Sequence, residues 1–363
     1  MEMNKKKYFS ILEQIKEEHK NAPVTKEHWL IADGNNLVMR NFFALPTMND
    51  NGDNVGAIVG SMKSLGYAIR QVHPTRLLVI FDGKGGSKRR RAIFPDYKEK
   101  RQMRVRVNRI YTDLVSVTNE DESLVKQMSR IIQYFECFPL RTMALENIEA
   151  DDTIAYCSQQ LLKDDRITIM STDKDFLQLV DHRVKVWSPT KKILYGPEKI
   201  LEQYGISAAN FLNYRILDGD KSDNVGGVPG LGLKTILKLF PVLKEETAKT
   251  VDEIITFSGY NISNSKIYKK VLDNKPLLNR NHALMQLKEV DIPSLTKLKI
   301  IDMIGAPINQ LNKVEFMRML IADKIANSIP NFNVWLSETF GLLDMSARRY
   351  NASLAEKKVE KTI

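Results

Sequence analysis

The chain has 363 residues and carries 54 Lys and Arg against 44 Asp and Glu, a net charge of +10. This length allows two domains with a substantial core, and the basic balance favours a polyanionic partner. The only two cysteines, Cys137 and Cys157, show no zinc-like Cys/His spacing, which excludes a disulfide scaffold and a structural zinc site and suits a reducing cytoplasm. No apolar run approaches the roughly 18 residues of a membrane span, so we expect no membrane partner.

Residues 1–28 read as an N-terminal extension. Tyr8, Leu12 and Ile15 are spaced to share one face of a helix, which ends at Asn21-Ala-Pro23. No apolar block follows the lysines near the start, so the segment is not a secretory signal. Two roles remain open for the helix: packing on the next domain, or docking onto a partner.

Three short apolar segments that each precede aspartates are predicted to be strands, namely Trp29–Ala32, Arg76–Phe81 and Arg166–Met170. Helical patterns at residues 55–72 and 124–135 lie between them. Short strands alternating with helices predict an α/β fold with a mostly parallel sheet covered on both faces. Ligands of such sheets bind beyond the carboxyl ends of the strands. Asp33, Asp82 and the segment Ser171-Thr-Asp-Lys-Asp175 fall at these ends.

A dense basic stretch follows the second strand. Residues 84–109 contain eleven basic residues opposed only by Asp96 and Glu99: Lys84, Lys88, Arg89, Arg90, Arg91, Lys98, Lys100, Arg101, Arg104, Arg106 and Arg109. A charge run is usually a solvated surface. This one is nearly one-signed and begins two residues after a strand-end aspartate, which favours contact with nucleic acid. The residues we expect to bind it are Lys84, Lys88, Arg89 and Arg104.

Acidic residues also cluster at Glu149-Ala-Asp-Asp152, where a helix continuing to Leu161 is predicted to begin. One acidic residue there could simply complement the helix dipole, but three exceed that need. The chain thus offers nine candidate carboxylates: Asp33, Asp82, Glu149, Asp151, Asp152, Asp173, Asp175, Asp220 and Asp223. If they converge, they need cations to stay ionised. Mg²⁺ is the natural choice, with Mn²⁺ as a substitute, and two ions could support an in-line displacement at phosphorus.

The last two carboxylates, Asp220 and Asp223, precede a glycine-rich turn and an apolar helix at residues 235–240. Backbone N–H groups at such a turn favour an anion. Metal ligands beside a phosphate-binding turn indicate a protein that acts on a phosphodiester backbone.

Taken together, the motifs resemble the 5′-nuclease superfamily of flap endonucleases and 5′→3′ exonucleases. The nearest likeness is to bacteriophage 5′ exonucleases and the 5′-nuclease domain of bacterial DNA polymerase I. The resemblance covers roughly residues 29–295. It rests on Ile31-Ala-Asp33-Gly-Asn-Asn-Leu37, Val79-Ile-Phe-Asp82, Pro95-Asp-Tyr-Lys98, Glu149-Ala-Asp-Asp152, Ser171-Thr-Asp-Lys-Asp175, Asp220-Lys-Ser-Asp223-Asn-Val225, Leu231-Gly-Leu-Lys-Thr235 and Asn279-Arg-Asn-His-Ala-Leu-Met-Gln-Leu287.

The resemblance implies a role for each candidate residue. The first metal would be held, directly or through water, by Asp33, Asp82, Glu149, Asp151 and Asp152. The second would be reached by Asp173, Asp175, Asp220 and Asp223. Lys98 and Arg101 would lie at the base of a helical arch and neutralise charge on the scissile phosphate. Tyr97 would stack on a base beside the cleavage site, with a packing role as its alternative.

The resemblance also implies a domain organisation. An N-terminal extension (1–28) precedes an α/β nuclease core (29–200) that includes a basic helical arch (84–135). A helix–turn–helix region (201–300) would bind duplex phosphates through Gly230, Gly232 and Lys234, with K⁺ held by carbonyls of the turn. Apolar patterns at residues 316–325 and 335–343 predict a C-terminal helical extension (301–363).

The expected function is that of a Mg²⁺-dependent, monomeric 5′ nuclease acting on DNA with a 5′ flap, a nick or a free 5′ end, or on an RNA/DNA hybrid. Without a polymerase domain, we expect a free-standing phage enzyme that removes RNA primers or flaps in the host cytoplasm. A single-strand binding protein or another replication protein would be its partner. The alternatives are a PIN-like ribonuclease, opposed by the glycine turn and the arch, and an inactive DNA-binding scaffold, opposed by the full carboxylate set and Lys98.

Overall fold

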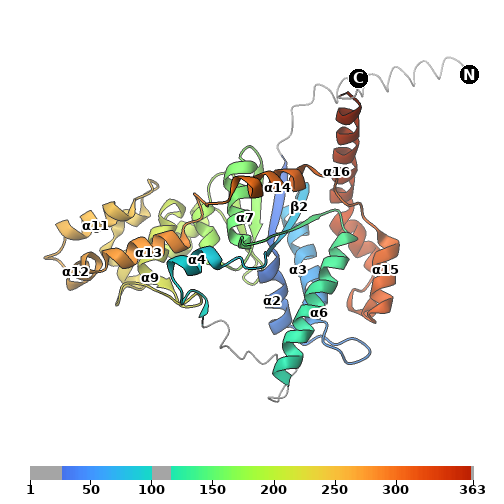
Figure 1. Ribbon diagram of the computed structural model, residues 1–363, viewed down its shortest axis with the longest axis horizontal. Coiled ribbons are helices and arrows are strands. Elements are labelled where there is room, and N and C mark those ends of the chain that lie inside the picture. The colour runs from blue at the N-terminus through green and yellow to red at the C-terminus, as the bar shows by residue number, and fades with distance from the viewer. Residues whose placement is uncertain (1–26, 100–115, 361–363) are drawn as a thin grey trace, which may run out of the picture.

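A computed structural model describes residues 27–99 and 116–360 of the chain (Figure 1). Its centre is a six-stranded sheet in the order β3-β2-β1-β4-β5-β6. The strands are β1 (His28–Asp33), β2 (Arg76–Asp82), β3 (Arg141–Leu145), β4 (Arg166–Met170), β5 (Val184–Ser188) and β6 (Ile193–Tyr195). Only β6 pairs antiparallel with its neighbour. The mostly parallel sheet predicted from the sequence is therefore confirmed.

Helices cover both faces of this sheet, as the alternation along β1 shows. Leu30 and Ala32 belong to one hydrophobic core, and Trp29 and Ile31 belong to the other. The first core is closed by α2 (Gly34–Ala44), α3 (Gly56–Val72) and α6 (Ser116–Glu136). The second is closed by α7 (Ala150–Tyr156), the π-helical turn η1 (Cys157–Leu161) and the 3₁₀ helix η2 (Lys174–Leu179). Strands buried on both faces need apolar residues at successive positions, which is why these segments read as continuous apolar runs.

The parallel strands all end at one edge of the sheet. In the strand register, Asp33 of β1 lies beside Ile80 of β2, and Asp82 at the end of β2 lies beside Leu145 of β3. The turns that follow β1, β2 and β4 therefore open on the same side. This is the edge at which a ligand site is expected in a parallel sheet.

A helical region follows the sheet. It contains α8 (Pro197–Tyr204), η3 (Ala208–Asn210), α9 (Phe211–Asp218), α10 (Leu233–Leu239), η4 (Pro241–Lys244), α11 (Val251–Tyr260), α12 (Lys266–Asp273) and α13 (Lys275–Met285). Between α9 and α10, the short strands β7 (Gly219–Asp220) and β8 (Val225–Gly226) pair antiparallel. Gly219 has φ +80°, and a Cβ there would lie 2.3 Å from the Gly227 nitrogen. Only glycine fits this close approach.

The C-terminal helices α14 (Ser294–Gly305), α15 (Lys313–Ala322) and α16 (Phe332–Glu360), with the 3₁₀ turn η5 (Ala326–Ser328), complete the fold. Figure 1 shows α15 and α16 at the end of the molecule opposite α11 and α12. Phe316 and Phe340 lie in the same core as α2 and α3, and the Phe340 ring stacks on Phe138 at 4.2 Å. This part of the chain is therefore built onto the sheet. Within the described ranges, we find no helix with the length and apolarity needed to cross a membrane.

Candidate active site

The site is built around Asp33, which follows β1 and caps the first turn of α2. One carboxylate oxygen accepts a hydrogen bond from the Asn36 backbone N–H at 3.0 Å, and the other accepts one from the Ser171 hydroxyl at 3.0 Å. Asp33 is only 6% exposed. Burial, reinforced by the nearby charges of Asp82 and Asp173, raises its pKa to about 7. The carboxyl ends of β1, β2 and β4 therefore do converge, as the sequence predicted.

Asp82 joins the end of β2 to the next acidic motif. Its Oδ2 accepts from the Asn35 side chain at 2.9 Å, and its Oδ1 accepts from the Ala150 backbone N–H at 2.7 Å. Ala150 is the first residue of α7. Asp82 thus satisfies a donor that the helix itself leaves free, and it holds Glu149-Ala-Asp-Asp152 against the end of the sheet.

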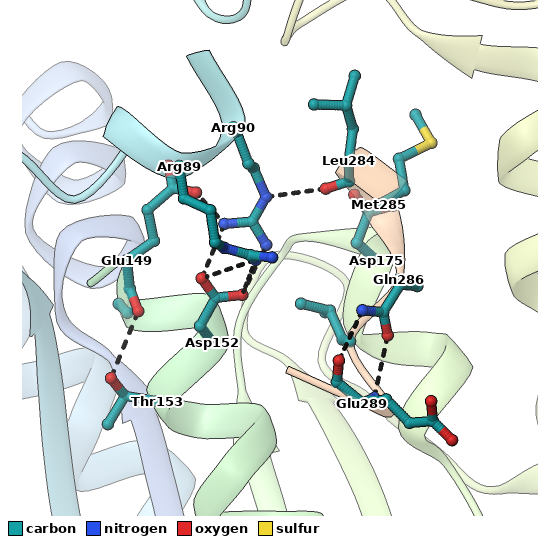
Figure 2. Close-up of polar contacts among 12 residues, drawn as sticks. Arg89, Arg90, Glu149, Asp152, Thr153, Asp175, Leu284, Met285, Gln286 and Glu289 are labelled. Carbon is teal, nitrogen blue, oxygen red and sulfur yellow. Dashed lines mark hydrogen bonds and ion pairs between the residues drawn. The ribbon is translucent and has the colours of Figure 1, made fainter. Parts of the chain in front are cut away.

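Two of the α7 carboxylates are engaged by basic side chains (Figure 2). The Arg90 guanidinium donates to Asp152 Oδ1 at 2.7 Å and Oδ2 at 3.0 Å, and it also donates to Glu149. Lys98 Nζ lies 2.6 Å from Glu149 Oε1. Burial alone would raise the pKa of Glu149, but Arg90 and Lys98 together hold it below its ordinary value.

Asp151 and Asp173 face a different environment. Neither forms an ion pair with Lys or Arg among the residues that the structure describes. The pKa of Asp151 is raised well above its ordinary value by burial, opposed by Lys98 and reinforced by Asp173 and Asp33. The pKa of Asp173 is also raised, chiefly by burial. For both carboxylates, burial and the neighbouring acids outweigh the attraction of the nearby cations, Lys98 for Asp151 and Arg215 for Asp173.

Two further carboxylates, those of Asp175 and Asp220, meet Arg215 of α9. Arg215 Nε lies 2.6 Å from Asp175 Oδ1, and its Nη2 donates to Asp220. Burial, with the charge of Asp173 added, raises the pKa of Asp175 to about 7 in spite of Arg215. The pKa of Asp220 is lowered, because Arg215 and hydrogen bonds from Ser222 outweigh burial. Arg215 therefore ties the strand-end acids to the acids that precede the glycine turn.

Lys98 and Tyr97 lie where the basic stretch meets this cluster. The Lys98 backbone, at φ +59°, donates its N–H to the Asp223 carbonyl at 2.9 Å. Tyr97 is 4% exposed and packs with Val225, Leu284 and Met285. That is the packing role left open for Tyr97, and its stacking on a base stays a prediction.

Several of these residues line one recess: Asp151, Asp175, Asp220 and Asp223, together with Arg90 and Tyr97. In the described ranges, no three acidic, histidine or cysteine side chains are gathered closely enough to bind one metal ion. The donor atoms are nevertheless of the right kind for a hard divalent cation, because all of them are carboxylate oxygens. Burial and neighbouring acids also raise the pKa of several of these carboxylates, which a bound cation would counteract. The predicted ligands are thus brought to one place, although basic side chains engage four of them: Glu149, Asp152, Asp175 and Asp220.

The predicted nucleic-acid contacts are more dispersed. Lys84, Lys88 and Lys234 are exposed. Arg89 turns inward, with its guanidinium 3.1 Å from Asp152. The turn glycines Gly230, at φ +92°, and Gly232, which precedes α10, are exposed. Arg101 and Arg104 lie outside the described residues, as does the predicted N-terminal helix.

Sequence reasoning did not single out Arg90 and Arg215, which pair with the carboxylates, or Asn35 and Ser171, which donate to them. Arg90 was one of eleven basic residues in a single stretch. Arg215 carried a weak signal, since it precedes Asp220 by five residues. Asn35 and Ser171 lie inside the quoted motifs, directly beside strand-end acids.

Comparison with known proteins was made on sequence and on fold. Residues 28–205 match the family described as the 5′-3′ exonuclease, N-terminal resolvase-like domain. A 5′-3′ exonuclease of Buchnera aphidicola subsp. Schizaphis graminum is 29% identical over 85% of this chain and 97% of its own length. A 5′-3′ exonuclease of Aquifex aeolicus is 32% identical over 58% of this chain and 67% of its own. DNA polymerase I of Bacillus subtilis is 32% identical over 62% of this chain, which spans only 24% of that polymerase.

Among solved structures, the bacteriophage T5 D15 flap endonuclease, in a complex with DNA and metal ions, has a TM-score of 0.58. It is 19% identical, and the alignment covers 82% of this chain and 99% of that one. At this identity the likeness shows a shared fold. The three relatives above are bacterial, so the expected phage source stays a prediction.

Proposed function

The chain belongs to the 5′-nuclease superfamily, and on that premise we propose that it hydrolyses phosphodiester bonds near the 5′ ends of structured DNA. Its substrates would be 5′ flaps, nicks and free 5′ ends, including RNA/DNA hybrids. One observation carries the proposal. Asp33, Asp151 and Asp173 meet at one edge of the sheet at raised pKa, and the Lys98 ammonium lies beside them on Glu149.

The carboxylate oxygens at this edge of the sheet are the kind of ligand that hard divalent metal ions prefer. The acids best suited to hold them are those without an arginine or lysine ion pair among the described residues: Asp33, Asp82, Asp151 and Asp173. Bound Mg²⁺, or Mn²⁺ in its place, would supply an activated water and neutralise phosphate charge. Asn36 and Ser171 would keep the Asp33 carboxylate oriented through their hydrogen bonds.

Lys98 is the residue we assign to the reacting phosphate. Its side chain is 13% exposed, and its ammonium forms an ion pair with Glu149. A cation fixed in a partly buried position stabilises charge that develops in a transition state more than a mobile one, because little reorganisation is needed. Arg101, three residues further on, would act with it. The Tyr97 ring, over which the Lys98 ammonium lies, would help to hold the lysine side chain in place.

Duplex binding is proposed for the region around the glycine turn. Lys234 is exposed at the start of α10, next to Gly230 and Gly232. Such contacts reach phosphates, so they position the duplex without reading its sequence. A K⁺ ion in this turn has less support, because the Lys270 ammonium already donates to the Pro229 carbonyl across 3.3 Å.

In the cell, this activity would remove RNA primers or flaps during DNA replication. A single-strand binding protein, or another replication protein, would be the partner. We propose that the chain acts as a monomer in the cytoplasm, which would be that of the host if a phage encodes it. RNase H activity on primer hybrids would follow from the same site.

The experiment that tests the proposal compares defined substrates. Purified protein is incubated with Mg²⁺ on a 5′-flap duplex, a nicked duplex, a blunt duplex and a single-stranded oligonucleotide, each with either a DNA or an RNA 5′ segment. We expect cleavage of the flap and nick substrates and little of the free single strand. Preference for single-stranded RNA would favour a PIN-like ribonuclease. Binding of every duplex without cleavage would favour an inactive scaffold.

A further inference from the structure

Arg90 is the most deeply buried charge in the described part of the basic stretch, residues 84–99. Its side chain is 3% exposed, whereas the neighbouring Arg89 is 28% exposed. A buried guanidinium is costly unless all of its donors are satisfied. Each guanidinium nitrogen of Arg90, which projects from α4 (Lys88–Ile93), has an acceptor: Asp152 of α7, Glu149 at the start of that helix, or the Leu284 carbonyl near the end of α13.

The partner that fits Arg90 best is Asp152. The two groups form a bidentate pair with N–O distances of 2.7 and 3.0 Å, which is the strongest geometry available to an arginine and a carboxylate. Arg89 adds contacts to the same two oxygens at 3.1 and 3.2 Å. Both oxygens of Asp152 thus accept hydrogen bonds from guanidinium groups, unlike Asp151, which forms no ion pair among the described residues.

Arg90 also reaches the C-terminal end of α13. Its Nε donates to the Leu284 carbonyl at 2.8 Å, where a cation complements the helix dipole (Figure 2). The same helix end holds the second group of acids, because Gln178 donates to the Met285 carbonyl at 3.0 Å and to the Asp175 carbonyl at 2.9 Å. One helix end therefore anchors both halves of the carboxylate cluster.

From these contacts we propose that Asp152 binds Arg90 in place of a metal ion, and that Arg90 is a positioning residue. It would fix the start of the basic stretch against α7 and orient Glu149 toward Lys98. Two adjacent acids of Glu149-Ala-Asp-Asp152 would therefore have different roles: Asp151 would bind the metal ion, and Asp152 would bind the guanidinium of Arg90. The proposal rests on the proposed nuclease function for its catalytic consequence only.

The test compares the Mn²⁺ affinities of Asp151→Asn and Asp152→Asn. Each variant is titrated with Mn²⁺ in the absence of DNA, and electron paramagnetic resonance monitors the free ion. We expect Asp151→Asn to weaken Mn²⁺ binding by about tenfold or more and Asp152→Asn to change it by less than about threefold. Equal losses of Mn²⁺ affinity in the two variants would overturn the assignment of Asp152. This readout requires no cleavage, so it stands even if the proposed nuclease function fails.

The positioning role is tested with Arg90→Lys, which keeps the positive charge but loses the planar fork. We expect the single-turnover cleavage rate at saturating flap DNA to fall about 10- to 100-fold, with DNA affinity in Ca²⁺ unchanged. Arg91→Lys, the same replacement at an exposed neighbour, controls for the chemistry and should leave Mn²⁺ affinity and melting temperature unchanged. An unchanged single-turnover rate in Arg90→Lys would contradict the role.

A double variant completes the design and covers the case in which Asp152→Asn folds poorly. If Arg90 and Asp152 act as one unit, Arg90→Lys with Asp152→Asn should lower the urea midpoint of unfolding little further than the more damaging single variant. Additive losses would show that the two residues act independently, and the proposal would then fail. Because the cycle measures unfolding, its outcome is separate from that of any cleavage assay.

Discussion

The Lys98 ammonium lies 2.6 Å from the Glu149 carboxylate, although the two residues are 51 positions apart in the chain. This contact joins the basic stretch that follows β2 to the acidic motif that opens α7. It places a cation at the edge of the sheet where the strand-end carboxylates meet. A polyanionic backbone entering this edge would meet a lysine that is already held in position.

Replacing Lys98 should therefore affect turnover more than binding. We expect Lys98→Met, which keeps the length of the side chain without its charge, to lower the single-turnover rate by about 10²- to 10³-fold. The dissociation constant for flap DNA in Ca²⁺ should stay nearly constant. Comparing Lys98→Gly with Lys98→Met isolates the backbone, because both variants remove the ammonium and only glycine relieves the φ of +59°. Equal losses in rate and affinity would remove Lys98 from the chemical step.

Asp173 should be required for cleavage, and its negative charge should lower the stability of the protein when no divalent ion is bound. It is one of several acids held at raised pKa by burial and by neighbouring acids. Asp173→Asn removes one negative charge from that group, so we expect lost cleavage, unchanged DNA affinity and a higher melting temperature at pH 8 without divalent ions. Differential scanning fluorimetry and a gel cleavage assay check this pair of effects. A variant that still cleaves at the wild-type rate would exclude Asp173 from the metal site.

The raised pKa values also predict how stability depends on pH. Asp33 titrates at about 7 in the folded chain against an ordinary value of 3.8. Between these values the folded state binds more protons than the unfolded state, so the free energy of unfolding falls as the pH rises. His28 acts in the opposite direction below about pH 6.5, because burial lowers its pKa to about 4. Asp175, whose pKa is also raised to about 7, adds to the effect of Asp33, and the two acids together outweigh His28. We therefore expect the melting temperature in EDTA to drop by roughly 2–4 °C from pH 5 to pH 8. Glu149 and Asp220 do not oppose this trend, because their pKa values are lowered and they titrate below the window.

Divalent ions should reverse that loss. Mg²⁺ binds ionised carboxylates, so it should raise the melting temperature more at pH 8 than at pH 5. The measurement is a thermal melt in EDTA and in Mg²⁺ at both values. A melting temperature that rises with pH in EDTA, or a Mg²⁺ effect that is the same at both pH values, would contradict the crowded-carboxylate account.

Arg215 should be a main contributor to stability within the site. It is 8% exposed and pairs with both Asp175 and Asp220. Removing one partner from a buried ion pair costs about 3–5 kcal/mol, because the other charge is left uncompensated. We expect Arg215→Met to lower the urea midpoint strongly and Mg²⁺ to restore part of the loss. Arg318→Met, which breaks an exposed pair with Glu315, is the matched control and should show no measurable change.

The sequence was sufficient to predict the strands that are buried on both faces. β1, β2 and β4 occupy inner positions of the sheet, and their runs of mostly apolar residues made them recognisable as strands. β3 and β6 are edge strands, and in Arg141–Leu145 only alternate residues are buried, one of them Arg141, which leaves a short apolar run. β5 is short and is interrupted by the exposed Lys185. Short segments of this kind do not stand out from loops without knowledge of their neighbours.

The carboxylates of the site were also predictable, because each lies at the end of a predicted strand, at the start of a predicted helix or just before the glycine-rich turn. Their partners were not. In the sequence Arg90 is one of several adjacent arginines, and only the packing of α4 against α7 and α13 shows that it is the buried one. Arg215 depends in the same way on the placement of α9 beside η2. Which cation meets which acid is decided by tertiary structure, and spacing along the chain does not encode it.

The most direct test of the account is cleavage of a 5′-flap DNA labelled separately on the flap and on the downstream duplex, in Mg²⁺ or in EDTA. Asp173→Asn, purified in parallel, excludes a contaminating nuclease. We predict Mg²⁺-dependent release of the flap near the junction by the wild-type chain and none by the variant. Wild-type protein that binds this DNA in Mg²⁺ but leaves both labels uncleaved would contradict the account.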